Sequence, residues 1–210
     1  MHSSRSAIAL AAILTSLIGG TAQAQDTAGS CPAGQELATD PAGDAKLYGQ
    51  IPAPDSLDVT KVAIAPNLAT GTSTVTLSVK KLDKTVPPNS TGLSWYLEYT
   101  VDGAAQYVDA TLAPDGTVTY ETGTDGQTYT PTGATNGTFD EATSTITIDI
   151  PDGYWGADLS TMRVATYEAV GVSIPAVGSA AFLPGADTVA LPDYSVPMCV
   201  APEEDPEAEL

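Results

Sequence analysis

The sequence predicts an all-β fold, a two-sheet immunoglobulin-like or jelly-roll-like β-sandwich. Three observations predict it. Apolar and polar residues alternate with a period of two over several short runs, Gly, Pro, Asp and Asn separate the runs, and no run keeps the 3.6-residue period of an amphipathic helix. Short strands without helices to cover a sheet bury their apolar faces against a second sheet.

The first 24 residues are expected to be a signal peptide that is removed on export. Arg5 precedes the apolar segment Ala7–Gly20, which is too short for a comfortable membrane span. Ala22 and Ala24 occupy the small-residue positions that predict cleavage before Gln25. We therefore expect a secreted protein, extracellular or periplasmic, without membrane insertion.

The remaining chain is expected to form one β-sandwich domain over residues 25–200 and an acidic disordered tail over residues 201–210. The tail carries five acidic residues and two prolines, and it lacks the apolar residues that a core needs. Gln25–Leu37 is polar and is not predicted to be a strand. Leu57–Ala65 changes its apolar phase near Thr60–Lys61, which predicts a β-bulge.

Regular alternation predicts the other strands. Trp95 shares its phase with Leu93 and Leu97, so we expect Trp95 in the core. The turn residues Ala113–Gly116 predict a β-hairpin over Gln106–Glu121. The further strand segments are Ser73–Lys81, Leu93–Val101, Ser144–Ile150 and Met162–Val170, and at most Gly156–Thr161 is expected to make a helical turn.

The charge of the chain is strongly negative. It has 7 basic and 26 acidic residues, a formal net charge of −19. Binding to nucleic acid requires clustered Lys and Arg side chains, so no nucleic-acid partner is expected, and anionic membrane surfaces are disfavoured for the same reason. Divalent cations and neutral ligands remain compatible with this charge.

The expected mature chain contains no histidine, because the single histidine, His2, belongs to the signal peptide. This excludes nucleophile systems that use imidazole as a base and zinc sites built on histidine. We therefore expect a protein that is not an enzyme. The alternative that the many acidic residues leave open is a carboxylate-dependent hydrolase. Cys31 and Cys199, an even pair in an exported chain, are expected to form a disulfide.

Four aspartates precede or open the first long strand: Asp40, Asp44, Asp55 and Asp58. One interpretation is structural, because the stretch Thr39–Ala45, TDPAGDA, has the proline and glycine that a tight turn requires. The other interpretation is a Ca²⁺ site, because calcium prefers several carboxylate and carbonyl oxygens from an irregular loop. The sequence leaves both open, and Ca²⁺ is the only cofactor that it suggests.

The order of motifs over Asp40–Val101 resembles a group of extracellular bacterial β-sandwich modules. Asp-x-x-Gly-Asp-Ala is followed by LDV at the start of a strand, by VTLSV and by the aromatic segment WYLEYTV. This order is similar to that of family-9 carbohydrate-binding modules and DOMON-like domains. The resemblance implies a sandwich with structural calcium, and it carries Asp40, Asp44 and Asp58 over as ligands. The resemblance supplies no sugar site. It also does not support the haem binding of some DOMON domains, because the expected mature chain has no histidine to hold the haem.

The loop Pro151–Asp158 is the candidate ligand site. Tyr154 and Trp155 are neighbours in a glycine-rich segment, so at least one of them is expected to face solvent, flanked by Asp152 and Asp158. An exposed ring beside carboxylates is how many sugar platforms are built. The alternative is that the aromatic pair caps one end of the sandwich.

These observations favour a secreted, non-catalytic binding or accessory module that recognises a glycan or another component of the cell envelope. A purely structural or protein-interaction domain of the cell envelope is the second interpretation, and a carboxylate-dependent hydrolase is the third.

Overall fold

The computed structural model describes residues 34–47, 50–88, 90–126, 129–170 and 186–199. The predicted signal peptide, the acidic tail and Cys31 lie outside the described residues. Cys199 lies within them and is buried, with 5% of its surface exposed. The disulfide between the two cysteines therefore stays a prediction.

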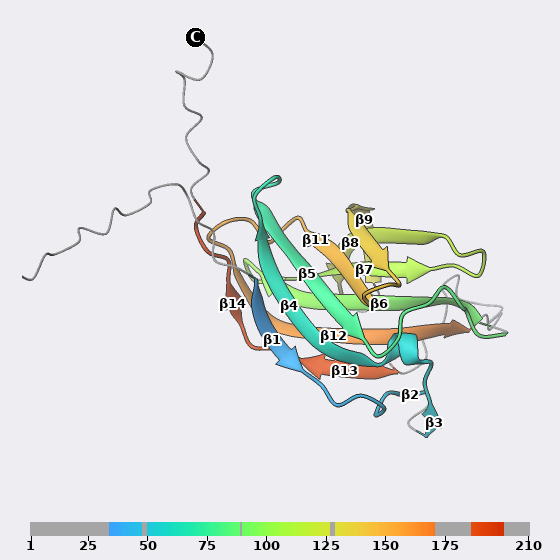
Figure 1. Ribbon diagram of the computed structural model, residues 1–210. Helices are drawn as coiled ribbons and strands as arrows, with labels where there is room; N and C mark the ends of the chain where they lie inside the picture. The colour runs from blue at the N-terminus through green and yellow to red at the C-terminus, as the bar shows by residue number, and fades with distance from the viewer. Residues whose placement is uncertain (1–33, 48–49, 89, 127–128, 171–185, 200–210) are drawn as a thin grey trace, which may run out of the picture.

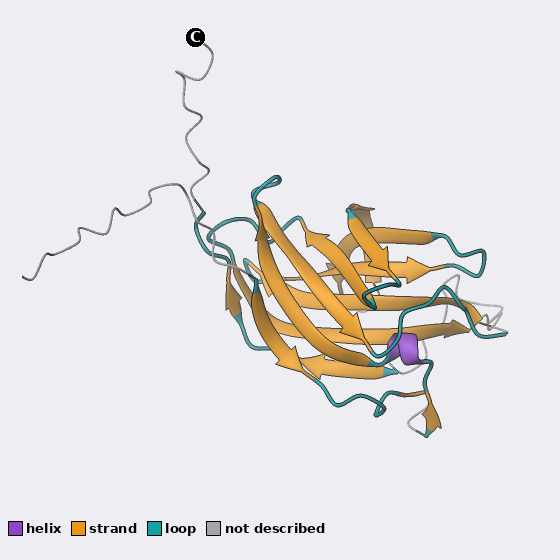
Figure 2. Cartoon of the chain, viewed as in Figure 1, coloured by secondary structure: helices purple, strands orange, loops and turns teal. Residues whose placement is uncertain are grey.

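The described strands form two main sheets that pack face to face, which confirms the predicted all-β sandwich (Figures 1 and 2). Strands β4 and β5 of the first sheet run in front of β6 and β12 of the second in Figure 1. The first sheet has the order β1 (Gln35–Thr39), β4 (Val59–Asn67), β5 (Thr72–Val79), β11 (Thr145–Ile150) and β10 (Gly137–Asp140).

The second sheet is larger and is built around the long strands β12 and β6. Its order is β13 (Asp187–Ala190), β12 (Asp158–Val170), β6 (Ser90–Val101), β7 (Ala104–Leu112), β8 (Val118–Asp125) and β9 (Tyr129–Ala134), and β14 (Tyr194–Ser195) pairs with β12. A small ribbon, β2 (Lys46–Leu47) with β3 (Ile51–Pro52), precedes the 3₁₀ helix η1 (Asp55–Leu57). All these strand pairings are antiparallel.

The core lies between the sheets and consists of the apolar phases that the sequence predicts. The fully buried side chains include Val75 and Leu77 of β5, and β11 and β6 supply further ones. Trp95 is 0% exposed, which confirms its core position. Its indole Nε1 donates a hydrogen bond of 2.7 Å to the Ser56 carbonyl, so the polar atom of this side chain is satisfied inside the core.

The predicted β-bulge is present in β4. The register with β5 shifts between Val59 and Lys61, while Val59 and Val62 are both fully buried. An extra residue in one strand restores the core-facing phase after the break, which explains the irregular apolar pattern. Lys61 faces outward and forms an ion pair of 2.6 Å with Glu36.

The predicted hairpin is also present, as β7 and β8. The Ala113 amide donates to the Thr117 carbonyl at 2.8 Å, and Gly116 has φ +84°. Because a residue with a side chain is disfavoured at that φ, glycine fits this turn. The Asp115 carboxylate accepts a 2.9 Å hydrogen bond from the Thr117 amide and fixes the turn further.

One expectation about local structure is wrong. Gln35–Thr39 is a strand, although the sequence to Leu37 does not predict one; it is an edge strand on β4 whose residues are all at least partly exposed, so it shows no buried alternation. The expectation that Gly156–Thr161 makes at most one helical turn holds, because this segment contains no helix and β12 begins at Asp158. Among the described residues no helix is long and apolar enough to cross a membrane.

Candidate functional site

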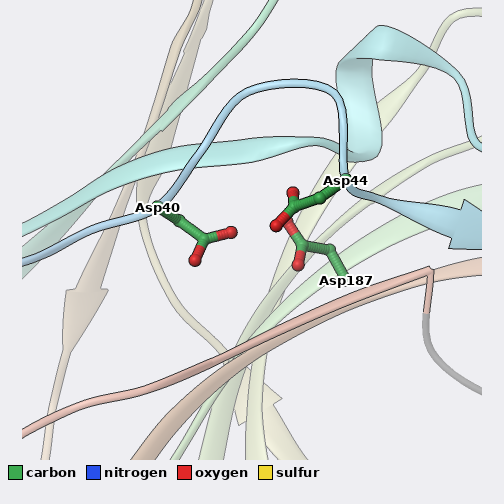
Figure 3. Close-up of side chains that lie close together, drawn as sticks. All are labelled: Asp40, Asp44 and Asp187. Atoms are coloured by element: carbon green, nitrogen blue, oxygen red, sulfur yellow. The ribbon is translucent and has the colours of Figure 1, made fainter.

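Three aspartate side chains from distant parts of the chain meet at one end of the sandwich. Asp40 and Asp44 come from the loop between β1 and β2, and Asp187 opens β13 (Figure 3). One carboxylate oxygen of each lies within 4.8 Å of the other two. We call these three residues the acidic cluster. Oxygens at this spacing can share one cation.

The turn expected at TDPAGDA exists and positions the cluster. The Asp40 amide donates to the Thr60 carbonyl at 3.0 Å, and Gly43 has φ +95°. The Gly43 amide donates a 2.6 Å hydrogen bond to Oδ2 of Asp58. The two interpretations of this stretch are therefore compatible, because the same turn that needs the glycine brings Asp40 and Asp44 together.

Asp187 joins the cluster through pairing across the whole domain. Its Oδ2 accepts a hydrogen bond of 2.8 Å from the Val59 amide, 128 residues away in the sequence. Next to it, the Ala186 carbonyl accepts a 2.7 Å hydrogen bond from the Lys46 amide. These contacts place the start of β13 beside the β1–β2 loop. Asp187 was not predicted, since nothing in the sequence near this residue marks it as a partner of the N-terminal loop.

Asp58 lies directly behind the turn and is 3% exposed. Its Oδ2 binds the Gly43 amide, whereas its buried Oδ1 has no hydrogen-bond partner among the described residues. Leaving a buried carboxylate oxygen unpaired costs free energy, about 1–3 kcal/mol and more for a charged group. The Gly43 amide ties Asp58 to the turn between Asp40 and Asp44. Beyond the effect of burial, the charge of Asp58 raises the pKa of Asp40, so Asp58 adds negative charge near the cluster.

Two carboxyl groups of the cluster, Asp40 and Asp187, have raised pKa values. Burial raises the pKa of Asp40, and the charges of Asp44 and Asp58 raise it further. Burial raises the pKa of Asp187 to about 6; the hydrogen bond from Val59 opposes the shift, while Asp40 and Asp44 add to it. Burial and neighbouring charge therefore favour the protonated forms of Asp40 and Asp187 more than in a free aspartate.

Asp55, the fourth expected calcium ligand, lies outside the acidic cluster. Its carboxylate forms an ion pair of 2.8 Å with Lys80. Asp55 begins η1, and this short helix separates it in the chain from Asp58. Asp187 lies in the acidic cluster instead, and the set of calcium ligands stays a prediction.

The loop Pro151–Asp158 exposes only one of its two aromatic residues. Tyr154 is 45% exposed, and its hydroxyl donates a 2.8 Å hydrogen bond to Asp102. Trp155 is half-buried and packs against the core, as expected of a cap over the sandwich end. Asp152 and Asp158 accept hydrogen bonds from Tyr99 and Ser195. The four residues expected to share a ligand therefore have separate local partners.

A second feature of the structure was not predicted at all. The face of the second sheet that points away from the core carries four tyrosines in mutual contact, which we call the tyrosine face: Tyr96, Tyr107, Tyr129 and Tyr167. Tyr96 and Tyr107 are 5% and 2% exposed. Because side chains alternate along a strand, these residues occupy the phase opposite to Trp95 and Val108. Tyr96 and Tyr107, which lie in the outward phase of β6 and β7, are the feature of the sequence from which this face could have been predicted.

Buried carboxylates accompany these rings. Glu98, 3% exposed, accepts hydrogen bonds from Arg163 and, at 2.5 Å, from the Tyr129 hydroxyl. Burial and the contact with Glu98 raise the pKa of Tyr129, and burial together with Asp109 raises that of Tyr107 to about 12. The hydroxyls of both tyrosines therefore stay neutral and act as donors or acceptors at physiological pH.

Comparison of the chain with protein-family models, with curated proteins and with solved structures finds no match. The function therefore has to be inferred from the geometry of these sites.

Proposed function

We propose that the protein is a secreted, non-catalytic binding module whose fold is stabilised by one Ca²⁺ ion at the acidic cluster. The observation that carries the proposal is the convergence of Asp40, Asp44 and Asp187 within 4.8 Å. Asp58, whose Oδ2 binds the Gly43 amide of the same turn, has a buried Oδ1 without a hydrogen-bond partner among the described residues. Carboxylate oxygens are the ligands that calcium prefers, and backbone carbonyls and water complete its six to eight positions.

The repulsion within the cluster supports a bound cation. Two like charges 4 Å apart repel by roughly 4 kcal/mol at an effective dielectric constant of about 20. None of the ion pairs among the described residues involves Asp40, Asp44 or Asp187, and Lys80 is paired with Asp55. A divalent ion would convert the repulsion into attraction and would link the β1–β2 loop to β13.

A calcium titration of the melting temperature tests the proposal. Ca²⁺ is expected to raise the melting temperature of the mature protein, because a ligand of the folded state alone stabilises it by about 2.7 kcal/mol at a hundredfold excess over Kd. Asp44→Ala should abolish the increase, and Asp44→Asn should retain part of it. Asp44 is exposed, so its replacement should leave the apo fold intact.

Asp55→Asn is the matched control, since Asp55 carries the same charge but lies outside the cluster. Its response to Ca²⁺ should equal that of the parent. Mg²⁺ at the same ionic strength should act much more weakly, because Mg²⁺ requires a strict octahedron and resists dehydration. The proposal would be contradicted if Ca²⁺ and Mg²⁺ raised the melting temperature equally, or if Asp44→Ala responded to Ca²⁺ as the parent does. Thr39–Ala45 would then be a turn only.

Carbohydrate recognition at Tyr154 is the second candidate function. The exposed ring of Tyr154 is held in place by the bond from its hydroxyl to Asp102, which suits stacking against a sugar. A glycan array separates this possibility from a structural or protein-interaction domain, because only a sugar-binding module would retain a defined set of glycans.

A further inference from the structure

A pocket of about 250 Å³ opens on the tyrosine face, between β6, β7, β8 and β9. Its walls include the rings of Tyr96, Tyr107 and Tyr129 and the carboxylates of Asp109 and Glu121. This volume is far larger than the ~10–15 Å³ that one water molecule needs, so a ligand group of several heavy atoms can enter.

Asp109 is the unusual group in this pocket. It is 3% exposed, and its Oδ2 accepts a 2.9 Å hydrogen bond from the Thr111 hydroxyl. Its buried Oδ1 has no hydrogen-bond partner among the described residues. Glu121 lies opposite Asp109 in the β7–β8 register, so a second carboxylate adds negative charge at the same place. A buried oxygen of this kind requires a donor, and an ionised one requires a cation.

The tyrosines give the pocket a rigid aromatic wall. The ring centroids of Tyr96 and Tyr129 are stacked at 4.7 Å, and that of Tyr107 lies 5.2–5.4 Å from both. The residues that line the pocket include no Lys, Arg, Asn or Gln. Arg163, the basic residue on the same face, is already paired with Glu98. Nothing that lines the pocket therefore neutralises Asp109 and Glu121.

We propose that this pocket binds the primary ammonium group of a small organic amine. An N–H of the ammonium would bond to Oδ1 of Asp109, Glu121 would supply the second negative charge, and the tyrosine rings would contact the cation and its aliphatic stem. Primary amines fit better than quaternary ones, because Oδ1 needs a hydrogen-bond donor. This inference rests on the proposal that the protein is a binding module, but it does not require Ca²⁺.

Calorimetric titration with butylammonium chloride tests the inference, with NaCl at matched ionic strength in the reference cell. Binding of butylammonium is expected, together with at least tenfold weaker binding of tetramethylammonium and of glucose. Asp109→Asn should weaken butylammonium binding at least tenfold, and Glu121→Gln should weaken it less, because Glu121 is exposed. Melting curves would show that both variants remain folded.

Asp125→Asn is the matched control, since Asp125 is another carboxylate of β8 but lines the neighbouring pocket. It should bind butylammonium as the parent does. Butylammonium binding should be the same with Ca²⁺ and with a calcium chelator, so a failure of the calcium proposal and a failure of this one are distinguishable. Three outcomes would each overturn the inference. They are no binding of butylammonium to the folded protein, equal binding of tetramethylammonium or glucose, and unchanged binding of butylammonium by Asp109→Asn.

The pH dependence gives an independent check. Burial raises the pKa of Asp109 to about 6. Hydrogen bonds with the Thr111 hydroxyl, the Glu121 backbone and the Tyr96 side chain oppose this rise, and the charge of Glu121 adds to it. The other groups facing Asp109 are tyrosines of β6, β7 and β9, whose raised pKa keeps them neutral. Affinity for butylammonium should therefore fall as the pH drops through about 6 and should stay constant between pH 7 and 8.

Discussion

At the scale of single residues, burial separates three aromatic side chains that look alike in the sequence. Trp95 is fully enclosed and makes its own hydrogen bond in the core. Trp155 is half-buried, and its Nε1, which is buried, has no hydrogen-bond partner among the described residues. Tyr154 is the residue of the three that presents its ring to solvent. The roles in stability and binding should divide accordingly.

We expect Trp95→Ala to lower the free energy of unfolding by about 3–5 kcal/mol, as large core truncations do. Trp155→Ala should cost less because part of its surface is already exposed, and Tyr154→Ala should stay within about 0.5 kcal/mol. Denaturation in urea measures these differences. If Tyr154→Ala also keeps the glycan-array profile of the parent, Tyr154 is not a sugar platform.

At the scale of elements, the pairing of β8 with β9 depends on the absence of a side chain at Gly123. A Cβ atom there would lie 2.3 Å from the Thr130 carbonyl oxygen and 2.6 Å from the Tyr107 ring. Real Cβ atoms do not approach this closely, so either the strands or the ring must move. Tyr107 lines the pocket of the tyrosine face, and Thr130 belongs to β9. A side chain at Gly123 would therefore disturb both the β8–β9 pairing and the shape of the pocket.

Gly123→Ala is expected to destabilise the protein by about 1–3 kcal/mol, the usual cost of overpacking, and to shift the NMR signals of Tyr107 and Tyr129. Gly133→Ala is the control from the partner strand, because the nearest atom to its new Cβ, Cγ2 of Thr122, would be 3.9 Å away. Equal losses of stability in the two variants would show that the close contact at Gly123 is not the cause.

At the scale of the whole molecule, the raised pKa values of Asp40 and Asp187 make stability depend on pH. The folded state retains protons that the unfolded chain, with an aspartate pKa of about 3.9, has already lost. Between roughly pH 4 and pH 6 the folded state therefore binds more protons, and stability must fall as the pH rises. Bound Ca²⁺ should cancel this loss above pH 6, where the carboxylates are ionised.

We expect the melting temperature of the calcium-free protein to fall from pH 4.5 to pH 7, and this decrease to become smaller in Asp187→Asn. The amide replaces the titrating group and keeps its size. Ca²⁺ should raise the melting temperature at pH 7.5 and have little effect at pH 4.5. A pH profile that Asp187→Asn leaves unchanged would rule out the cluster as its source.

The sequence by itself determined the local structure of this protein. The period-two alternation in β5, β6 and β11, the phase change at the bulge of β4 and the glycine of the β7–β8 turn follow from steric and hydrophobic effects between residues close in the chain. These effects predicted the sandwich and the place of Trp95. They also predicted the turn that joins Asp40 and Asp44, because that turn needs only Pro41 and Gly43.

The tertiary structure decided which residues meet. Asp187 enters the acidic cluster through a hydrogen bond across 128 residues, whereas Asp55 lies outside it and pairs with Lys80, on the segment after β5. The tyrosine face depends on the register of five strands, β12, β6, β7, β8 and β9, which pairing fixes only after the chain has folded. Contact between distant segments is set by sheet order and register, and no pattern within one strand encodes either of them.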